Sequence, residues 1–215
     1  MNMEELEAEV KTLKDSHKIL EDKLRVYEDI EEIKRLQRIY GFYLEHWMSQ
    51  EIVDLFSDDP SVSVEMSISG VFTGKEGIKR YFFGTKPTPE FLHQVLQVQP
   101  VIDITPDGKS AQGRWYGWGL MAIPMGDGIW EGYNNGLYEC EYVKEDGKWK
   151  FKKIHWNRIF MAPYSEGWVK PERKVTGDPV AQPNRFKPDL PTTTHNPYPS
   201  GITVPFHFKH PITGK

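Results

Sequence analysis

The sequence has little of several features that classify a protein quickly. It has one cysteine, Cys140, in 215 residues, so an intrachain disulfide framework is excluded. No stretch reaches the roughly 20 apolar residues that a membrane helix needs. Residues 1–5 are polar apart from two methionines, without the apolar segment of a signal peptide. We therefore expect a cytoplasmic protein that has no membrane partner.

The chain also lacks an excess of positive charge and the common cofactor motifs. Its net charge is −4 and its lysines and arginines are scattered, which disfavours nucleic acid as a partner. It has no Gly-rich phosphate loop of a nucleotide-binding fold. Its seven histidines form no close pair on an expected helix, and no cysteine stands at zinc-finger spacing. We predict a protein without a cofactor or a metal site.

The first segment, residues 1–29, carries a regular apolar repeat. Its members recur in alternating steps of three and four residues: Met3, Leu6, Val10, Leu13, His17, Leu20, Leu24 and Tyr27. Such a heptad seam with charged residues between its members is typical of a coiled coil. Within the seam, His17 is either a tolerated polar residue that sets the oligomeric state or a pH-sensitive device. Because a short coiled-coil helix is marginal alone, the seam predicts self-association.

The middle segment, residues 30–162, predicts an α+β domain. A wider apolar stripe over 30–44 is typical of a helix packed on a sheet, and short helices are expected at 51–56 and 74–83. Alternating apolar and polar residues predict strands, most of them separated by Asp-Gly turns. The expected strands are 61–66, 92–104, 110–123, 130–143 and 149–161. Helices first and long hairpins afterwards indicate a curved antiparallel sheet.

The last segment, residues 163–215, holds ten of the sixteen prolines together with several aromatic residues. A disordered tail is normally poor in aromatic residues. Proline restricts φ and so lowers the entropy lost when an extended chain becomes ordered. This segment therefore predicts an extended arm that lies over a surface of the protein.

Several short motifs in this order resemble the SnoaL-like branch of the nuclear transport factor 2-like superfamily. They lie at residues 40–45, 54–59, 72–78 and 147–151, together with His93 at the start of the first long strand. The resemblance covers about 130 residues. It implies a cone-shaped fold, in which a curved antiparallel sheet wraps around helices and encloses a deep cavity for a small-molecule substrate.

A narrower resemblance covers nearly the whole chain. The N-terminal seam and the motifs at 154–156, 160–164 and 204–208 are similar to a longer SnoaL-like subgroup that includes cofactor-free diarylpropane lyases. Those enzymes release formaldehyde from lignin-derived diols. Because related lyases are often trimers, the resemblance implies a homo-oligomer, a trimer before a dimer.

The family resemblance also implies a pair of catalytic residues. In related dehydratases a carboxylate on the first helix orients a histidine on the first long strand, and these positions match Glu45 and His93. A carboxylate fixes the histidine tautomer and stabilises the imidazolium, so that the other ring nitrogen acts as a base. The family more often has aspartate at the position of Glu45, so a longer side chain is expected to alter this pairing.

Each of the other candidate site residues has an ordinary structural role as an alternative. Strict alternation from Trp149 places His155 and Asn157 on one face of the last strand, unless a bulge intervenes. His155 is then a general acid or an outward-facing histidine. Arg114 pairs with an anionic substrate oxygen or is a solvated strand residue. Tyr40, Tyr43 and Trp118 are expected to position or line the substrate, or to pack in the core.

The function predicted from these residues is a cofactor-independent lyase that works by acid–base chemistry. It dehydrates an aromatic or polycyclic alcohol, or releases formaldehyde from it by a retro-aldol step. An isomerase or cyclase that uses the same histidine base is the first alternative. A non-catalytic module that binds a small molecule is the second.

Overall fold

A computed structural model describes residues 2–85, 88–169, 187–193 and 204–214. Its helices are α1 (Met3–Glu45), α2 (Ser49–Asp54) and α3 (Gly74–Phe82), with a short 3-10 helix at Ser67–Ser69. Its strands are β1 (Ser63–Met66), β2 (Val71–Thr73), β3 (Leu92–Ile104), β4 (Ser110–Met125), β5 (Gly128–Glu145) and β6 (Lys148–Pro163). Among the described residues, no helix has the length and apolarity needed to cross a membrane.

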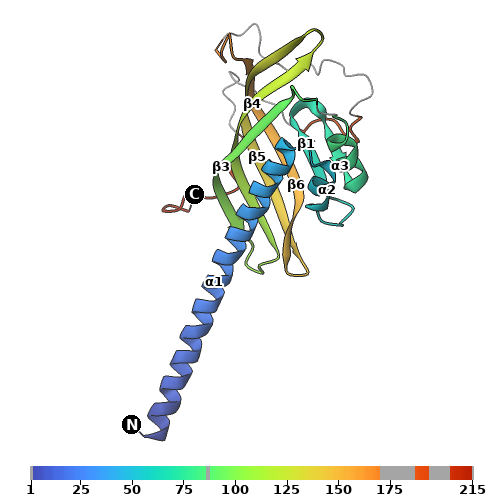
Figure 1. Cartoon of the computed structure of the whole chain (residues 1–215). Helices are drawn as coiled ribbons and strands as arrows, with labels where there is room; N and C mark the ends of the chain where they lie inside the picture. Colours follow the sequence, from blue (N-terminus) through green and yellow to red (C-terminus); the bar gives the residue numbers. More distant parts are fainter. Residues whose placement is uncertain (1, 86–87, 170–186, 194–203, 215) are drawn as a thin grey trace.

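Helix α1 is one continuous helix that crosses the expected boundary at residue 29 without a break. It begins with a capping box, in which the Asn2 side chain accepts from the Glu5 amide at 2.8 Å and the Glu5 carboxylate accepts from the Asn2 amide at 2.9 Å. Its first buried residue is Asp29, which accepts a hydrogen bond from Trp149 Nε1 at 2.8 Å and pairs with Lys144. The part before Asp29 projects from the domain (Figure 1). The division into segments 1–29, 30–162 and 163–215 stays a prediction.

The sheet has six strands in the order β2-β1-β6-β5-β4-β3. Strands β3 to β6 form a long antiparallel meander, whereas β1 pairs with β6 in parallel. The β5–β6 hairpin turns at Asp146 and Gly147, which have φ of 49° and 76°, as a tight hairpin turn requires. The expected α+β fold, with helices held against a curved open sheet, is confirmed.

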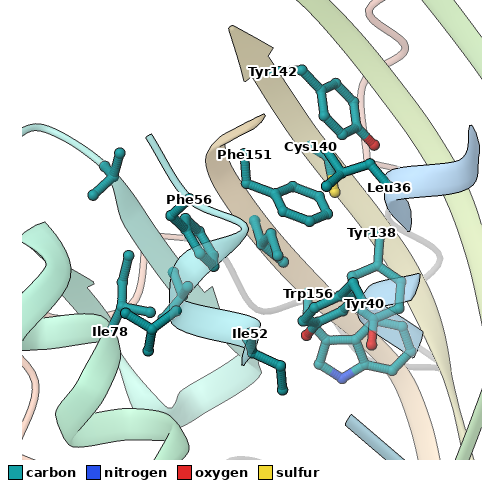
Figure 2. Packing of buried hydrophobic residues seen from close by; sticks show 14 of the residues in the cluster. Leu36, Tyr40, Ile52, Phe56, Ile78, Tyr138, Cys140, Tyr142, Phe151 and Trp156 are labelled. Atoms are coloured by element: carbon teal, nitrogen blue, oxygen red, sulfur yellow. The ribbon is translucent and has the colours of Figure 1, made fainter. Parts of the chain in front are cut away.

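The core lies between the helices and the concave face of the sheet (Figure 2). Tyr40 of α1 is fully buried there, with its ring edge-on to those of Tyr138 and Phe151. A buried polar chain crosses the same layer: Trp115 Nε1 donates to Tyr142 Oη at 2.9 Å, and Tyr142 donates to Gln37 at 2.8 Å. Because these buried polar groups form hydrogen bonds with one another, they fix the register of α1 on the sheet.

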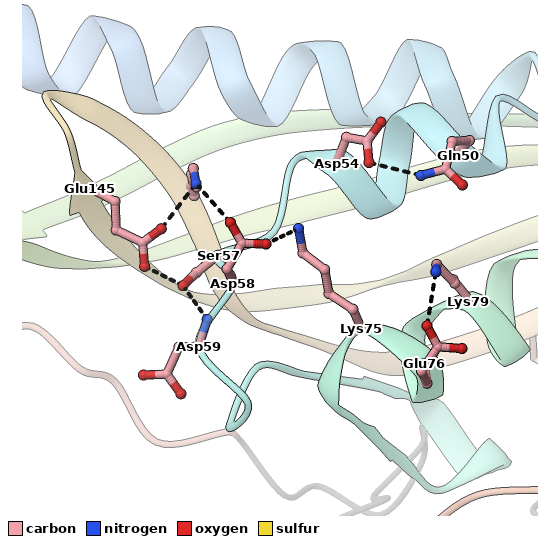
Figure 3. Close-up of polar contacts among 10 residues, drawn as sticks. Gln50, Asp54, Ser57, Asp58, Asp59, Lys75, Glu76, Lys79 and Glu145 are labelled. Atoms are coloured by element: carbon pink, nitrogen blue, oxygen red, sulfur yellow. Dashed lines mark hydrogen bonds and ion pairs between the residues drawn. The ribbon is translucent and has the colours of Figure 1, made fainter.

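Polar contacts hold the connection between α2 and β1 against the β5–β6 hairpin (Figure 3). Ser57 donates to Glu145, and Lys150 bridges Glu145 at 3.0 Å and Asp58 at 3.7 Å. Asp58 also pairs with Lys75 of α3. The contact with Lys75 holds the pKa of the Asp58 carboxyl below its usual value. These contacts fix the loop that leads from the helices into the sheet.

A bulge in β6 decides which side chains face the core. Tyr142 pairs with Phe151 and Glu141 with Lys153, so one extra residue lies in β6 between these pairs. Phe151 and Ile154 are therefore both in the core, although they are three residues apart. From this bulge to Arg158 the even-numbered residues face the concave side and the odd-numbered residues the convex side, until a second extra residue at 159 reverses the faces again.

Two described pieces of the expected C-terminal arm lie against the domain. Leu190 forms a backbone bridge with Val71, and Asp189 accepts from the Thr73 amide at 2.8 Å and pairs with Arg80 at 2.6 Å. Residues 204–208 lie against the convex face of the sheet, where they contact Arg114. Residues 170–186, 194–203 and 215 of the proline-rich segment lie outside the described residues.

Candidate active site

A cavity of about 340 Å³ lies between the helices and the concave face of the sheet. This volume is at the lower end of the range for small-molecule sites. Most of its wall is apolar, with Leu44, Ile52, Phe82, Met121, Ile123 and Met161 among its lining residues. The polar residues in its wall include His93, Asn134, Arg158, Ser49 and Thr85 and the phenols of Tyr40, Tyr81 and Tyr138. A few polar groups in an apolar wall are typical of a ligand-binding site.

His93 lies in the wall of this cavity, at the start of β3. Its Nδ1 atom is buried and makes no hydrogen bond within the described part of the chain. Burial lowers the pKa of the imidazole to about 4, and the positive charge of Arg158 contributes in the same direction. His93 is therefore uncharged at neutral pH, with a ring nitrogen able to accept a proton.

Arg158 of β6 also lines the cavity. Its Nε atom is buried without a hydrogen-bond partner, and none of the described carboxylates forms an ion pair with it. Burial lowers the pKa of the guanidinium, which still remains charged at neutral pH. A cation withdrawn from water without a counter-ion is costly, so this position favours an anionic ligand. Local alternation along β6 does not indicate Arg158, because only the bulge turns this side chain toward the cavity.

Trp47 forms the wall beside His93. It follows the C-terminus of α1 in a left-handed conformation, with φ of 58°, where glycine is usual. Its ring centroid lies 4.5 Å from that of Phe91 and 5.5 Å from that of His93. A non-glycine residue in this region costs about 1–3 kcal/mol, which the packing of the ring must offset. No sequence pattern indicates this role, since Trp47 has no regular place in the apolar stripe of the helix.

The expected Glu45–His93 pair is not formed. Glu45 Oε1 accepts instead from Gln94 Nε2 at 3.4 Å. Gln94 follows His93 directly in β3, and consecutive side chains in a strand point to opposite faces. At about 100° per residue, Glu45 is also turned by more than a quarter of a circle from Tyr40 and Leu44, which line the cavity. The carboxylate therefore points away from the imidazole.

The expected general acid, His155, also lies elsewhere. It is on the convex side of the bulged strand, where its Nε2 atom is 3.5 Å from Oε1 of the buried Glu65. Burial lowers the pKa of His155, and the nearby Glu65 carboxylate partly opposes this shift. Asn157 shares this face of β6, as predicted from the alternation, but the face is not the one that borders the cavity.

Arg114 holds the C-terminal arm rather than a substrate. It pairs with Glu139, and its Nη2 atom donates to the carbonyl oxygen of Val204 at 3.2 Å. Its guanidinium also stacks on the Phe206 ring, 4.6 Å from the centroid. Arg114 is therefore not among the residues that line the cavity, and its polar atoms contact Glu139 and the arm.

Of the three aromatic candidates, one lines the cavity and two lie elsewhere. Tyr40 lines the cavity as expected. Tyr43 packs against the core without lining the cavity. Trp118 lies on the convex face, where its ring contacts those of Tyr133 at 5.7 Å and Phe160 at 6.3 Å. Of the eight residues expected at the site, His93 and Tyr40 are therefore the two that line this cavity.

The position of Arg114 gives a testable result for the arm. Replacing Arg114 with alanine removes the ion pair, the carbonyl contacts and the stacking, so residues 204–214 should be cleaved at least about tenfold faster by a protease under native conditions. Ligand binding in the cavity, on the other face of the sheet, should change less than about twofold. Lys109→Ala, at an exposed lysine of the β3–β4 turn, serves as the control. Unchanged cleavage in the Arg114 variant would contradict this role.

Comparison with known protein families matches residues 25–155 to the SnoaL-like domain. This match spans more than half of the chain. The chain belongs to the SnoaL-like domain family. The match includes Tyr40, Trp47 and His93 but ends three residues before Arg158, so this guanidinium lies just outside the matched part of this SnoaL-like protein.

Solved structures with the same fold support the assignment. A provisionally named scytalone dehydratase from Novosphingobium aromaticivorans is 20% identical, with a TM-score of 0.57 over 68% of this chain and 95% of its own. A hexachlorocyclohexane dehydrochlorinase (LinA, type 2) is 15% identical, with a TM-score of 0.59 over 69% and 97%. ActVI-ORFA from Streptomyces coelicolor is 14% identical, with a TM-score of 0.51 over 60% and 96%. No curated protein matches this SnoaL-like chain significantly.

Proposed function

We propose that this SnoaL-like protein is a lyase that eliminates a small leaving group from an anionic aromatic or polycyclic alcohol. One observation carries the proposal: an uncharged imidazole, His93, and a guanidinium, Arg158, that pairs with no described carboxylate face the same apolar cavity. The first can accept a proton and the second can hold the negative charge that develops when the proton leaves. The names of the structural neighbours, a scytalone dehydratase and a dehydrochlorinase, agree with elimination chemistry.

In a dehydration, Arg158 would bind the oxygen of a phenolate, carboxylate or enolate. His93 would take a proton from the carbon next to the activating group, and the C–H electrons would form the new double bond as the C–O bond breaks. The departing hydroxyl group takes a proton and leaves as water. In the retro-aldol alternative, His93 would take the proton of a hydroxymethyl group, the C–C bond would break, and formaldehyde would leave with the electrons retained on the substrate.

Binding of an anion would also prepare His93 for this role. The charge of Arg158 lowers the pKa of His93, together with burial. An anion beside Arg158 offsets that charge and so raises the pKa of the imidazole toward neutral pH, where a base is most effective. The substrate would thus increase the basicity of the group that attacks it.

The phenols at the cavity replace His155 as candidate proton donors. Burial raises the pKa of Tyr81 to about 12 and the pKa of Tyr138 beyond its usual range. Both stay protonated at neutral pH and can therefore donate a hydrogen bond to a leaving oxygen. Asn134 Oδ1, which is buried at the same wall, can accept one from a substrate hydroxyl.

Two alternatives use the same cavity. An isomerase or cyclase would need the same base but return the proton to the substrate instead of expelling a leaving group. A binding module would need the cavity and Arg158 but not His93. A cytoplasmic location and a homo-oligomer, with a trimer before a dimer, stay predictions.

Ligand binding tests the charge preference directly. The protein is titrated with pairs of aromatic ligands that differ only in charge: a carboxylate and its neutral amide, or a phenolate and its methyl ether. The anionic member of each pair should bind with an affinity about ten- to a hundredfold higher than the neutral member. Any ligand that binds is then assayed, in its β-hydroxy form, for release of water or formaldehyde. Binding of neutral ligands with equal affinity would contradict the role of Arg158. Binding without release of either product would favour the binding module.

A further inference from the structure

The outer part of α1, residues 3–28, contacts nothing else in the described structure. Every side chain in it is exposed, and it projects from the domain with the N-terminus at its far end (Figure 1). At about 1.5 Å per residue it extends about 39 Å. A lone helix is marginal in water, and this one keeps Leu6, Leu13, Leu20 and Leu24 at 42 to 63% exposure. Its stability therefore requires a partner.

The apolar seam of this segment is free to meet a partner. The stripe that packs on the domain consists of Asp29, Ile33, Leu36, Gln37 and Tyr40. At 3.6 residues per turn, this stripe lies on roughly the opposite side of α1 from the seam. Residues 31 and 38, which would continue the seam, are charged and exposed. Pairing along the seam would thus end where the domain begins, without a clash between the domains.

We propose that residues 3–28 form a parallel, in-register coiled coil with a second copy of this chain. In the heptad, Met3, Val10, His17 and Leu24 take the a positions, and Leu6, Leu13, Leu20 and Tyr27 the d positions. The charges that flank the seam at the e and g positions decide the orientation. In a parallel pair each g residue faces the e residue five positions later in the other copy.

The parallel arrangement matches opposite charges. Glu9 faces Lys14 of the second copy, and Lys23 faces Glu28 of the second copy. By symmetry each pair forms twice, and no like charges meet across the seam. The flanking charges are therefore complementary to a second copy of the same chain.

The antiparallel arrangement brings like charges together. If residues 3 and 27 face each other, e residues pair with e residues and g with g. Glu7 then faces Glu21 of the second copy, and the two copies of Lys14 face each other. The favourable pairs of Glu9 with Lys23 are offset by these repulsions, so the charge pattern selects the parallel orientation.

The same charges disfavour an anionic membrane as the partner. Residues 3–28 hold eight acidic and five basic side chains, so the segment has a negative net charge. Helices that lie on membranes typically carry lysine and arginine on the polar face. The seam is also a narrow heptad stripe rather than a broad apolar face.

Disulfide trapping in the full-length protein tests the orientation. In a parallel pair the two copies of residue 6 meet at a d position, so Leu6→Cys should cross-link to itself in a glutathione redox buffer. In the antiparallel pair these residues would be about 27 Å apart. Ala8→Cys, on the outer face, is the matched control and should not cross-link. The only native thiol, Cys140, is buried, so the unmodified protein serves as the blank.

The outcomes are distinct. Self-cross-linking of Leu6→Cys, but not of Ala8→Cys, supports the proposal. Failure of Leu6→Cys alone, with cross-linking in a mixture of Leu6→Cys and Leu24→Cys chains, would show an antiparallel pair and overturn it. If neither Leu6→Cys alone nor the mixture with Leu24→Cys forms cross-links, and the protein sediments as a monomer, self-association through this seam is ruled out. Sedimentation also counts the copies, and either two or three parallel helices satisfy the proposal.

A charge exchange tests the same point without a cysteine. Glu9→Lys should weaken association about two- to tenfold, because it places two lysine pairs across the seam. A second change, Lys14→Glu in the same chain, should restore it in a parallel coil. Restoration by Lys23→Glu instead would identify the antiparallel arrangement and contradict the proposal. Both measurements are independent of ligand and activity, so they stand apart from the proposed lyase function.

Discussion

Replacing His93 with alanine should lower kcat/KM by about two to four orders of magnitude, because the proposed base is removed. The imidazole borders a cavity, and its Nδ1 atom makes no hydrogen bond to the residues that the structure describes, so its loss should leave the fold intact. Steady-state kinetics and the far-ultraviolet circular dichroism of the same sample check the two parts. His46→Ala, at an exposed histidine near the end of α1, is the matched control and should keep nearly full activity.

The pH profile adds a readout that a structural role would not change. The proposed base works when it is unprotonated, and burial lowers the pKa of free His93 to about 4. The value of kcat/KM should therefore be level near neutral pH and fall as the pH drops through about 4, to the extent that the protein stays folded. In the complex with an anion the pKa is expected to be higher, so kcat should begin to fall at a higher pH than kcat/KM. Near-normal turnover by His93→Ala on an authentic substrate would refute the assignment.

Replacing Arg158 with methionine should lower the affinity for an anionic ligand but raise the stability of the free protein. Affinity for an anionic ligand should fall about ten- to a hundredfold, because a hydrogen-bonded charge is lost. The melting temperature of the free protein should rise by about 2–4 °C, because a buried charge without a counter-ion is removed and the methionine fills similar volume. Titration calorimetry and thermal unfolding measure these two effects.

Arg114→Met is the matched control for this prediction. Both arginines lie on the sheet, Arg114 buried and Arg158 partly buried, but Arg114 pairs with Glu139 whereas none of the described carboxylates pairs with Arg158. Removing one member of a buried pair leaves the other charge uncompensated, so Arg114→Met should lower the melting temperature. Its effect on ligand binding should be small. A fall in stability for Arg158→Met as well would mean that the guanidinium is a structural group, and the proposed oxyanion role would be lost.

Much of the fold could be predicted from local patterns. The strand 92–104 was predicted with the bounds observed for β3, and the other long strands within two residues at each end. Alternation and Asp-Gly turns are local signals that tertiary packing did not override here. The motifs for the SnoaL-like family were likewise sufficient for the family assignment, which the match to residues 25–155 confirms.

The candidate site depended on features that local patterns do not encode. Glu45 was placed by resemblance, but its angle around α1 turns it away from the cavity that Tyr40 lines. Arg114 has the chemistry of an anion-binding residue, yet the arm, about 90 residues later in the chain, occupies its polar atoms. Such long-range partners cannot be inferred from the sequence around one residue, because they arise only when distant segments meet.

By itself the sequence determined the fold class, the long meander, the seam on the N-terminal helix and the histidine at the start of β3. Only the tertiary structure decided which polar groups share the cavity. One extra residue in β6 moves His155 to the convex face and Arg158 to the concave face. Because side chains alternate with a period of two along a strand, a single inserted residue reverses the faces of the residues that follow it, here as far as the second bulge after Arg158.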